Sequence, residues 1–325
     1  MQVFKTIVNL FPIEVHRLVW VAKDAALSPL FYVVVGFVFF LEKMIPVNKS
    51  QKIFSASLVQ DFLWFQMDNL FQLTLIPFYI GFLETIYDRY LAFLTIHAVK
   101  SWPMGARFLM GFLVTDFLVW FHHFLRHRVK YFWFFHTIHH SQKATNIFTE
   151  GRFHTVEALI AWIVRFIPVF MLDLNGVSIF AMALIQRWYS RIYHANLRTN
   201  YGFLKYFMVT PQSHRIHHSN ELRHRDKNFG VIFTIWDRLF GTLYKNYDEY
   251  PPETGIDDPQ FPHEIELRGI SFVATLARQF LYPFRLLIWD IQETVRRKVP
   301  VQVNLQQSIA DSKAQEAVYE EEFSK

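Results

Sequence analysis

Eight histidines lie in three short clusters, out of fifteen in the 325-residue chain. The clusters are His123-x-x-x-His127, His136-x-x-His139-His140 and His214-x-x-His217-His218. On a helix, residues at positions i, i+3 and i+4 share one face, so each cluster would present its imidazoles to one side. Eight nitrogen donors are too many for one tetrahedral ion, which takes about four protein ligands. The spacing therefore predicts a site for two metals.

The isolated histidines have simpler explanations. We expect His16, His97 and His263 at the surface or in hydrogen bonds within the core. A His-rich surface tract could also bind metal adventitiously. The H-x-x-H-H pattern occurs twice, however, and clustered imidazoles without partners would be costly inside an apolar protein. The repetition favours a metal site over these alternatives.

The composition limits the chemistry of such a site. The chain is 52% hydrophobic and 18% aromatic, it has 36 phenylalanines, and it has no cysteine. Disulfides, cysteine zinc sites and thiolate ligation are therefore excluded, and histidine and oxygen must hold any metal. Imidazole suits iron, copper and zinc. The net charge of +5 is dispersed among aromatic residues, which fits a membrane-facing surface better than a nucleic-acid groove.

Several apolar stretches approach the roughly 20 residues that a spanning helix needs. They are residues 25–41, 70–83, 108–121, 156–172 and 177–185. Pro77 is expected to kink the second stretch. The last two are joined by a turn-like Asp-Leu-Asn-Gly sequence, which predicts a hairpin that enters the bilayer and returns. We expect an all-α integral membrane protein with about four to five membrane-embedded helices.

That hairpin would put all three histidine clusters on one side of the membrane. The loop expected to hold the first pair carries Arg126, Arg128 and Lys130. Because basic residues accumulate on the cytoplasmic side, the sequence predicts a multi-pass protein with a cytosolic helical cap around the metals.

The two ends of the chain are more polar. Residues 1–23 lack a small-residue cleavage site, so we expect an amphipathic helix on the bilayer and no cleavable signal peptide. A second interfacial helix is expected over 270–289, after a loop at 247–262, and the polar tail 311–325 is expected to be disordered. The sequence suggests an N-terminal membrane region, a catalytic domain and a C-terminal region, at residues 1–100, 101–245 and 246–325.

Asp116 lies inside an apolar stretch, where an acidic residue is costly and usually functional. It precedes His123 by about two helical turns and would share its face. It could accept a hydrogen bond from a ligand imidazole, or it could simply lie near the membrane interface.

Other metal and cofactor motifs fit poorly. The soluble di-iron bundle needs two Glu-x-x-His motifs, and only Glu221 and His224 form one. His263-Glu264 lacks the second histidine of a zinc protease, and no Gly-rich phosphate loop occurs, so nicotinamide or flavin is not expected on this chain. Electrons would have to come from a partner.

From about residue 111 to 244, the chain resembles the fatty acid hydroxylase/sterol desaturase superfamily of integral membrane di-iron enzymes. The resemblance rests on the three histidine boxes in order and on their flanks, which are Asp116-Phe117, Arg152-Phe153-His154, His194-Ala195-Asn196, Asp226-Lys227-Asn228-Phe229-Gly230 and Trp236-Asp237-Arg238-Leu239-Phe240-Gly241-Thr242. It departs at Phe124, where the family often has arginine, and at Thr155, where proline is usual.

The resemblance implies that the eight box histidines ligate two irons, with His194 as a further ligand and His154 as a weaker candidate. Zinc could replace iron in purified protein. The side chains that could orient ligands are Asp116, Asn196, Asp226 and Asn228. His122 is expected to be a neighbour of the site, and His224 a surface residue.

The implied reaction is O2-dependent hydroxylation or desaturation of an unactivated C–H bond. The substrate would be a lipid drawn from the bilayer, such as a fatty acyl, sterol or alkyl-glycerol lipid, and the flanks lean toward the alkylglycerol monooxygenase-like branch. A separate electron donor of the cytochrome b5, ferredoxin or reductase type is implied, and no nucleic acid is expected. The alternatives are a histidine-based divalent metal transporter or sensor and a metal hydrolase, which would need a general base beside an open metal.

Overall fold

The structure is a computed structural model that describes residues 29–174, 176–263 and 269–297. Within these ranges the regular structure is helical, and the β-structure consists of two isolated bridges, Pro46 with Leu197 and Met208 with Phe233. The prediction of an all-α protein is confirmed. The helix expected over 1–23 and the tail expected over 311–325 lie outside the described residues.

The N-terminal part begins with three helices, α3 (Pro29–Met44), α4 (Ala56–Thr74) and α5 (Ile76–Ile86). Pro77 lies in the first turn of α5, where its missing N–H costs nothing, and α4 ends three residues before it. The predicted kink is therefore a full break between two helices. Three short helical segments follow, at Tyr87–Leu91, Ala92–Leu94 and His97–Ser101.

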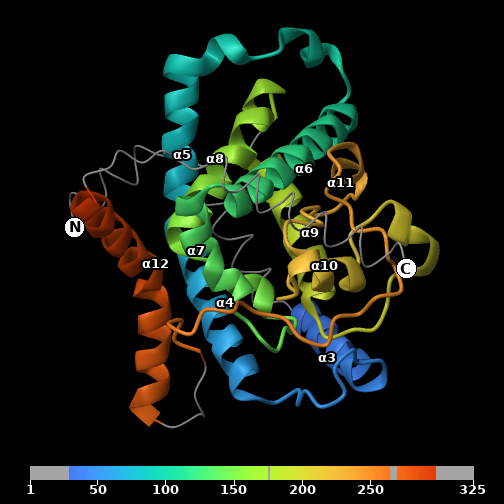
Figure 1. Cartoon of the computed structure of the whole chain (residues 1–325). Coiled ribbons are helices and arrows are strands. Elements are labelled where there is room, and N and C mark those ends of the chain that lie inside the picture. The colour runs from blue at the N-terminus through green and yellow to red at the C-terminus, as the bar shows by residue number, and fades with distance from the viewer. Residues whose placement is uncertain (1–28, 175, 264–268, 298–325) are drawn as a thin grey trace, which may run out of the picture. The chain divides into compact units, whose positions relative to one another are not determined.

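Four longer helices form the centre of the chain, α6 (Met104–Arg128), α7 (Lys130–His140), α8 (Thr155–Met171) and α9 (Gly176–His194). Figure 1 shows α6 in green beside α8 and α7, and α6 packs against both. The predicted hairpin is present as the pair α8 and α9, and Asp173 in the connecting turn has a φ of 54°.

Shorter elements complete the second half. They are Thr149–Gly151, Gly202–Tyr206, α10 (Pro211–His217), Leu222–His224, α11 (Ile235–Leu239) and α12 (Gly269–Arg297). A capping box starts α10, because Thr210 and Ser213 each bond the other's backbone N–H. Residues 247–262 form no helix, as predicted, and the predicted helix over 270–289 lies within α12.

The chain divides into two compact units. The described residues up to Pro283 form the first and those from Phe284 onward form the second, so α12 belongs to both. The described helices before residue 100 lie in the same unit as α6 to α11, because α4 packs against the Thr149–Gly151 segment.

Fewer candidate membrane helices are found than the four to five expected. In the described ranges, Met104–Arg128 is long and apolar enough to cross a membrane, and the pair Ala56–Gln72 and Ile76–Leu94, bent by 45°, could make a second span. Length separates two of the remaining helices from this class, since α8 has 17 residues and α3 has 16 described residues.

The segment that holds the first histidine pair is a helix and not the expected loop. His123 and His127 occupy the last two turns of α6, and Arg126 between them is buried and forms an ion pair with Glu157 at 3.0 Å. Arg126 is therefore not a loop charge of the kind that the positive-inside rule counts. The cytoplasmic side of the site stays a prediction.

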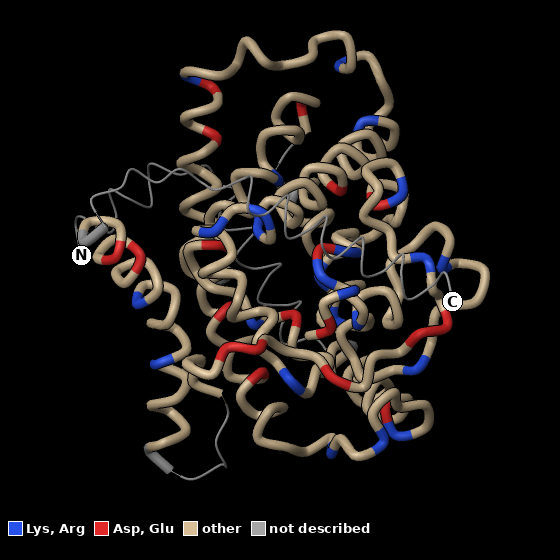
Figure 2. The backbone as a smooth tube through the Cα atoms, viewed as in Figure 1, with Lys and Arg blue, Asp and Glu red and all other residues tan. Residues whose placement is uncertain are grey.

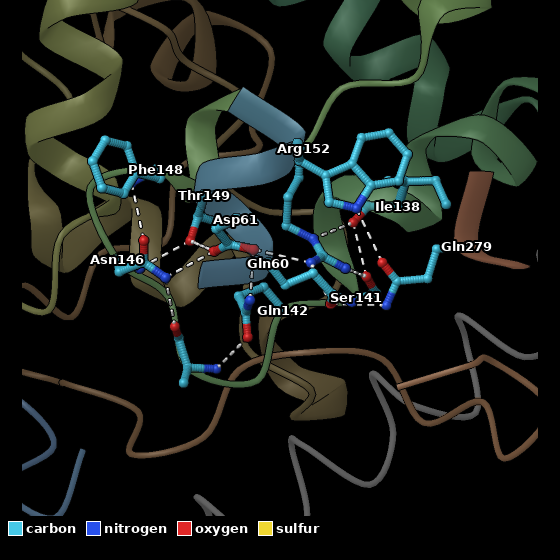
Figure 3. A network of polar contacts seen from close by, with 12 residues as sticks. Gln60, Asp61, Ile138, Ser141, Gln142, Asn146, Phe148, Thr149, Arg152 and Gln279 are labelled. Carbon is cyan, nitrogen blue, oxygen red and sulfur yellow. Dashed lines mark hydrogen bonds and ion pairs between the residues drawn. The ribbon is translucent and has the colours of Figure 1, made fainter. Parts of the chain in front are cut away.

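A buried polar network joins α4 to the segment after α7 (Figure 3). The Asp61 carboxylate accepts hydrogen bonds from Gln142, Asn146 and Thr149 and pairs with the Arg152 guanidinium at 2.9 Å. Arg152 also donates from Nε to the Ile138 carbonyl in α7 at 3.1 Å. Asp61 and Arg152 are both fully buried, so each balances the charge of the other, which would be costly in the core without a counter-ion.

This network predicts that Asp61→Asn destabilises the protein. The amide keeps the shape but leaves the buried Arg152 charge without its counter-ion, which should cost about 3 kcal/mol of unfolding free energy. Thermal unfolding of the purified protein measures the loss. Asp88→Asn at an exposed position is the matched control and should unfold like the wild type. Equal melting temperatures for both variants would contradict this role of Asp61.

Candidate metal centre

Nine histidines converge in two groups of potential ligands within the described part of the chain. In each group the candidate ligand atoms all lie within 4.8 Å of one another. Group one contains His123, His127, His136, His140 and His217, and group two contains His139, His194, His214 and His218. All eight box histidines and His194 are thus brought together as predicted.

Each H-x-x-H-H box contributes to both groups. The outer histidines of the first box, one helical turn apart in α7, belong to group one, and its middle histidine, His139, belongs to group two. In the second box the outer pair belongs to group two and the middle histidine, His217, to group one. The two groups adjoin, since the His140 and His218 rings stack with centroids 4.4 Å apart. Each copy of the repeated motif therefore supplies histidines to both groups.

Acceptors on the protein orient three imidazoles of group one. His123 Nδ1 donates to the Phe229 carbonyl at 2.9 Å, His217 Nδ1 donates to the Lys227 carbonyl at 2.9 Å, and His136 Nδ1 bonds Glu157 Oε1 at 2.7 Å. Because these oxygens accept, Nδ1 carries the proton and each Nε2 keeps a free lone pair.

Those Nε2 atoms have no hydrogen-bond partner among the residues that the structure describes. The Nε2 atoms of all five histidines of group one are buried without one. An unpaired buried polar atom is costly, and five such acceptors directed to one place fit a bound cation. Group one therefore has the donor set of a metal ion that prefers imidazole, such as iron or zinc.

Group two shows the same feature through close nitrogen contacts. His194 Nδ1 donates to the Ser190 carbonyl at 2.7 Å, so its Nε2 carries a lone pair. That Nε2 lies 2.8 Å from Nε2 of His214 and 3.2 Å from Nε2 of His139. Converging imidazole nitrogens need a proton or a metal between them to offset the repulsion of their lone pairs. A second metal fits this place.

Burial keeps these imidazoles in the neutral form that binds metal. Desolvation lowers the pKa of His217 to about 3, although its bond to the Lys227 carbonyl works in the opposite direction. Desolvation also lowers the pKa of His139, His140, His214 and His218 well below the usual value, and neighbouring histidines add to the effect. Metal ligands must be deprotonated, so the site is prepared for binding near neutral pH.

The loop 226–230 supplies the carbonyl acceptors of group one. Asp226 and Asn228 have left-handed φ values of 60° and 58°, which alternate with Lys227 and Phe229, whose carbonyls accept from the histidines. Asn228 holds this shape by donating to the Ser213 carbonyl and accepting from the Tyr244 N–H. Asn228 thus shapes the loop that carries the acceptors, and a direct role in orienting a ligand stays a prediction.

Asp226 lies next to the first histidine box. Its carboxylate is 3.9 Å from Nδ1 of His127 and forms an ion pair with Arg128 at 3.2 Å. Asn196 acts on the backbone. Its side chain accepts a hydrogen bond from the Asn48 N–H and donates one to the Asn48 carbonyl. It fixes the chain two residues after His194 without touching an imidazole in the contacts observed.

Asp116 does not contact a histidine in the contacts observed, which corrects the direct role considered for it. Its carboxylate accepts from the Ile232 N–H at 3.1 Å and from the Trp236 indole at 2.9 Å. Asp237 acts similarly and accepts from the Phe229 and Gly230 N–H groups, both at 2.8 Å. Asp237 thus holds the loop whose carbonyls orient the histidines, and Asp116 holds the segment that directly follows this loop.

Three further histidines lie outside both groups. His154 caps α8 by accepting from the Val156 N–H, and its Nε2 donates to the Phe280 carbonyl at 3.2 Å. His122 accepts from Arg126 and is a neighbour of the site, as expected. His224 is buried and bonds Ser219 and Glu249, so its prediction as a surface residue is wrong.

Glu157 was missed in the sequence. It lies in an apolar stretch, α8, and its Oε1 accepts from both His136 and Arg126. The signal was available, because a carboxylate in such a stretch is costly unless it has a partner. Asp237 was noted only as part of the Trp236–Thr242 flank, and the sequence did not show that its carboxylate accepts from the Phe229 and Gly230 N–H groups.

The chain is similar to known lipid-modifying proteins. Residues 108–242 match the Fatty acid hydroxylase family. Ornithine lipid hydroxylase OlsE of Rhizobium tropici is 28% identical over 55% of this chain and 52% of its own length. Alkylglycerol monooxygenase of Caenorhabditis elegans is 31% identical over 48% of this chain and 30% of its own length. No solved structure matches significantly. The chain thus spans about half or less of the length of these relatives.

The His136–Glu157 contact predicts that Glu157→Gln weakens metal binding. The neutral amide is a poorer acceptor for His136 and leaves Arg126 unpaired, and loss of such a supporting carboxylate typically lowers metal affinity about 10–100-fold. Metal retained against a chelator series measures the effect. Glu253→Gln at an exposed position is the control. A folded Glu157→Gln protein with wild-type retention would refute the role.

Proposed function

We propose that the chain, of which residues 108–242 match the Fatty acid hydroxylase family, is a membrane oxidoreductase that uses O2 to hydroxylate or desaturate a C–H bond of a lipid. The observation that carries the proposal is the pair of adjoining histidine groups with buried nitrogens that lack protein partners. The relatives named above, one a hydroxylase and one a monooxygenase, both modify lipids by name.

The proposed cofactor is a pair of iron ions, which zinc could replace in purified protein. Group one would hold one iron and group two the other, with His194 as the ninth ligand and no role for His154. Bound iron would supply the redox chemistry that activates O2, the proposed co-substrate. Nine neutral imidazoles leave the charge of such ions uncompensated, unlike the carboxylate-rich soluble di-iron bundles.

The side chains around the histidines have two tasks in this proposal. Glu157 and the carbonyls of Lys227 and Phe229 fix the imidazole orientations, so that Nε2 stays directed at the metal. Aromatic rings exclude water: the His127 ring packs against Phe229 at 5.0 Å and Trp133 at 5.1 Å between centroids. A dry surround protects reactive species from side reactions.

Exposed apolar surface supports a position in the membrane. On α3 the large residues Tyr32, Val33, Phe37 and Phe40 are each more than half exposed. Contiguous apolar surface of this kind marks contact with lipid or another protein. Together with the span candidate α6, it supports the proposal of an integral, multi-pass membrane protein whose metal groups lie at the cytoplasmic interface.

The proposed partners follow from the reaction. The lipid substrate would enter from the bilayer, and a separate donor of the cytochrome b5, ferredoxin or reductase type would provide electrons. Figure 2 shows Lys and Arg scattered along the described part of the chain and interspersed with Asp and Glu.

The division of each box between two groups predicts the metal content of single variants. Wild-type protein should bind about two ions per chain. His139→Ala removes a ligand of group two and His140→Ala one of group one, so each should lose at least one ion and the O2-dependent turnover. His97→Ala, at an exposed position, is the control. Metal analysis and oxygen consumption give the readout. Full metal content and turnover in His139→Ala would refute the centre.

The reaction itself predicts a lipid product. Cells that express the chain should contain lipids with one added oxygen or two fewer hydrogens than cells that express His139→Ala. Growth under ¹⁸O2 shows whether an added oxygen comes from O2, because an oxygen inserted from O2 raises the product mass by the isotope difference. Identical lipid profiles, together with metal-dependent ion flux in proteoliposomes, would favour the transporter alternative.

A further inference from the structure

A cavity whose wall includes histidine and arginine side chains lies against both histidine groups. Its volume is about 70 Å³, which is room for roughly five waters at 10–15 Å³ each. Helices α6, α7, α8, α9 and α10 all contribute to its wall. The histidines that line it are His123 and His136 of group one and His139, His194 and His214 of group two. Whatever fills this cavity therefore lies beside the predicted metals.

The charges around the cavity do not balance. Arg126 pairs with Glu157, Arg187 pairs with Asp68 and Glu150, and Arg191 shares Glu150. Arg165 is the fourth arginine against these three carboxylates, and no carboxylate among the described residues lies within ion-pair distance of it. One positive charge is left over, and Arg165 lines the cavity.

The contacts of Arg165 leave most of its donors unused. Its Nε lies 3.5 Å from Gln186 Oε1, and its guanidinium carbon lies 5.9 Å from the Trp162 ring centroid. A guanidinium offers five N–H donors in a planar fork that matches a carboxylate or phosphate. The remaining donors are free for an anionic group.

Two neighbouring side chains add unused donors. Gln186 is only 1% exposed, lines the cavity, and has no partner for its Nε2. The Nε of Arg126, also in the cavity wall, is likewise buried without a partner. Buried donors without acceptors are costly, so these atoms indicate a ligand that brings acceptor oxygens.

We propose that this cavity binds the anionic head of the lipid substrate, a carboxylate or a phosphate, through Arg165 and Gln186. The inference rests on the proposed function and deepens it by naming the substrate class. The cavity adjoins both histidine groups, so a head held there would place the first carbons after the head at the reactive centre. Carbons far along the hydrocarbon chain would lie away from it. Metals held by neutral imidazoles would add to the positive field and further favour an anion.

Binding of short amphiphiles tests the proposal without turnover. Purified protein in phosphatidylcholine nanodiscs is titrated calorimetrically with octyl phosphate, octanoate and 1-octanol. At least one anion should bind about tenfold or more tightly than the alcohol, as expected for charge-assisted hydrogen bonds to a desolvated arginine. Preference for octyl phosphate assigns a phosphate head, and preference for octanoate assigns a carboxylate.

Matched variants locate the effect at Arg165. Arg165→Gln should abolish the preference for the anion and leave 1-octanol unchanged, whereas Arg165→Lys should retain part of it. Arg278→Gln removes the same charge from an exposed position and should bind like the wild type. Retained metal and an unchanged melting temperature show that the variants are folded.

The proposal is overturned if the wild type binds the three amphiphiles equally, or if Arg165→Gln and Arg278→Gln lose the anion preference to the same extent. Failure of the oxygenase function looks different. In that case the anion preference would persist, while the lipids would show neither an added ¹⁸O nor two fewer hydrogens relative to cells that express His139→Ala.

Discussion

The site depends on the desolvation of nine imidazoles in one small volume. A buried imidazole is stable only when it is neutral and when both ring nitrogens are satisfied. The protein satisfies one nitrogen of His123, His217 and His194 with a carbonyl and one of His136 with Glu157. The Nε2 atoms of His123, His136 and His217 have no partner among the described residues, and Nε2 of His194 meets those of His139 and His214. A bound metal would satisfy these nitrogens.

Much of the surrounding architecture serves to place these acceptors. The Lys227 and Phe229 carbonyls need a loop with alternating left-handed residues, and such a loop does not hold its shape alone. The buried carboxylate of Asp237 fixes it directly, and that of Asp116 fixes the segment after it through the Ile232 N–H. At the opposite end of the centre, the network around Asp61 and Arg152 holds the last turn of α7, where the first H-x-x-H-H box ends (Figure 3). Buried charged side chains far apart in the sequence thus fix the backbone segments that carry or orient the histidines.

The sequence revealed the features that depend on local periodicity. Spacing on one helical face indicated that each box acts as a unit, and the donor count indicated two metals. It could not show that each box serves both groups, because that depends on how α7 and α10 face one another. Asp116 shows the same limit: its burial and importance were visible, but its partners lie about 116 residues away in the loop before α11. The charges in α8 and α9 show it again: Glu157 of α8 pairs with Arg126 of α6 and Arg187 of α9 pairs with Asp68 of α4, and hydropathy does not reveal such buried pairs.

The same desolvation that keeps the histidines neutral makes an unpaired arginine costly. Most charges around the centre are paired within the fold, as Glu150 shows by serving both Arg187 and Arg191. The exception, Arg165, faces the cavity that the histidines also line. A chain with exposed apolar helices and a cationic internal cavity suits an amphiphile, whose hydrocarbon stays in the bilayer while its anionic head is drawn to the charge. Selectivity for the carbon that reacts would then follow from electrostatics at the head and not from the length of the hydrocarbon tail.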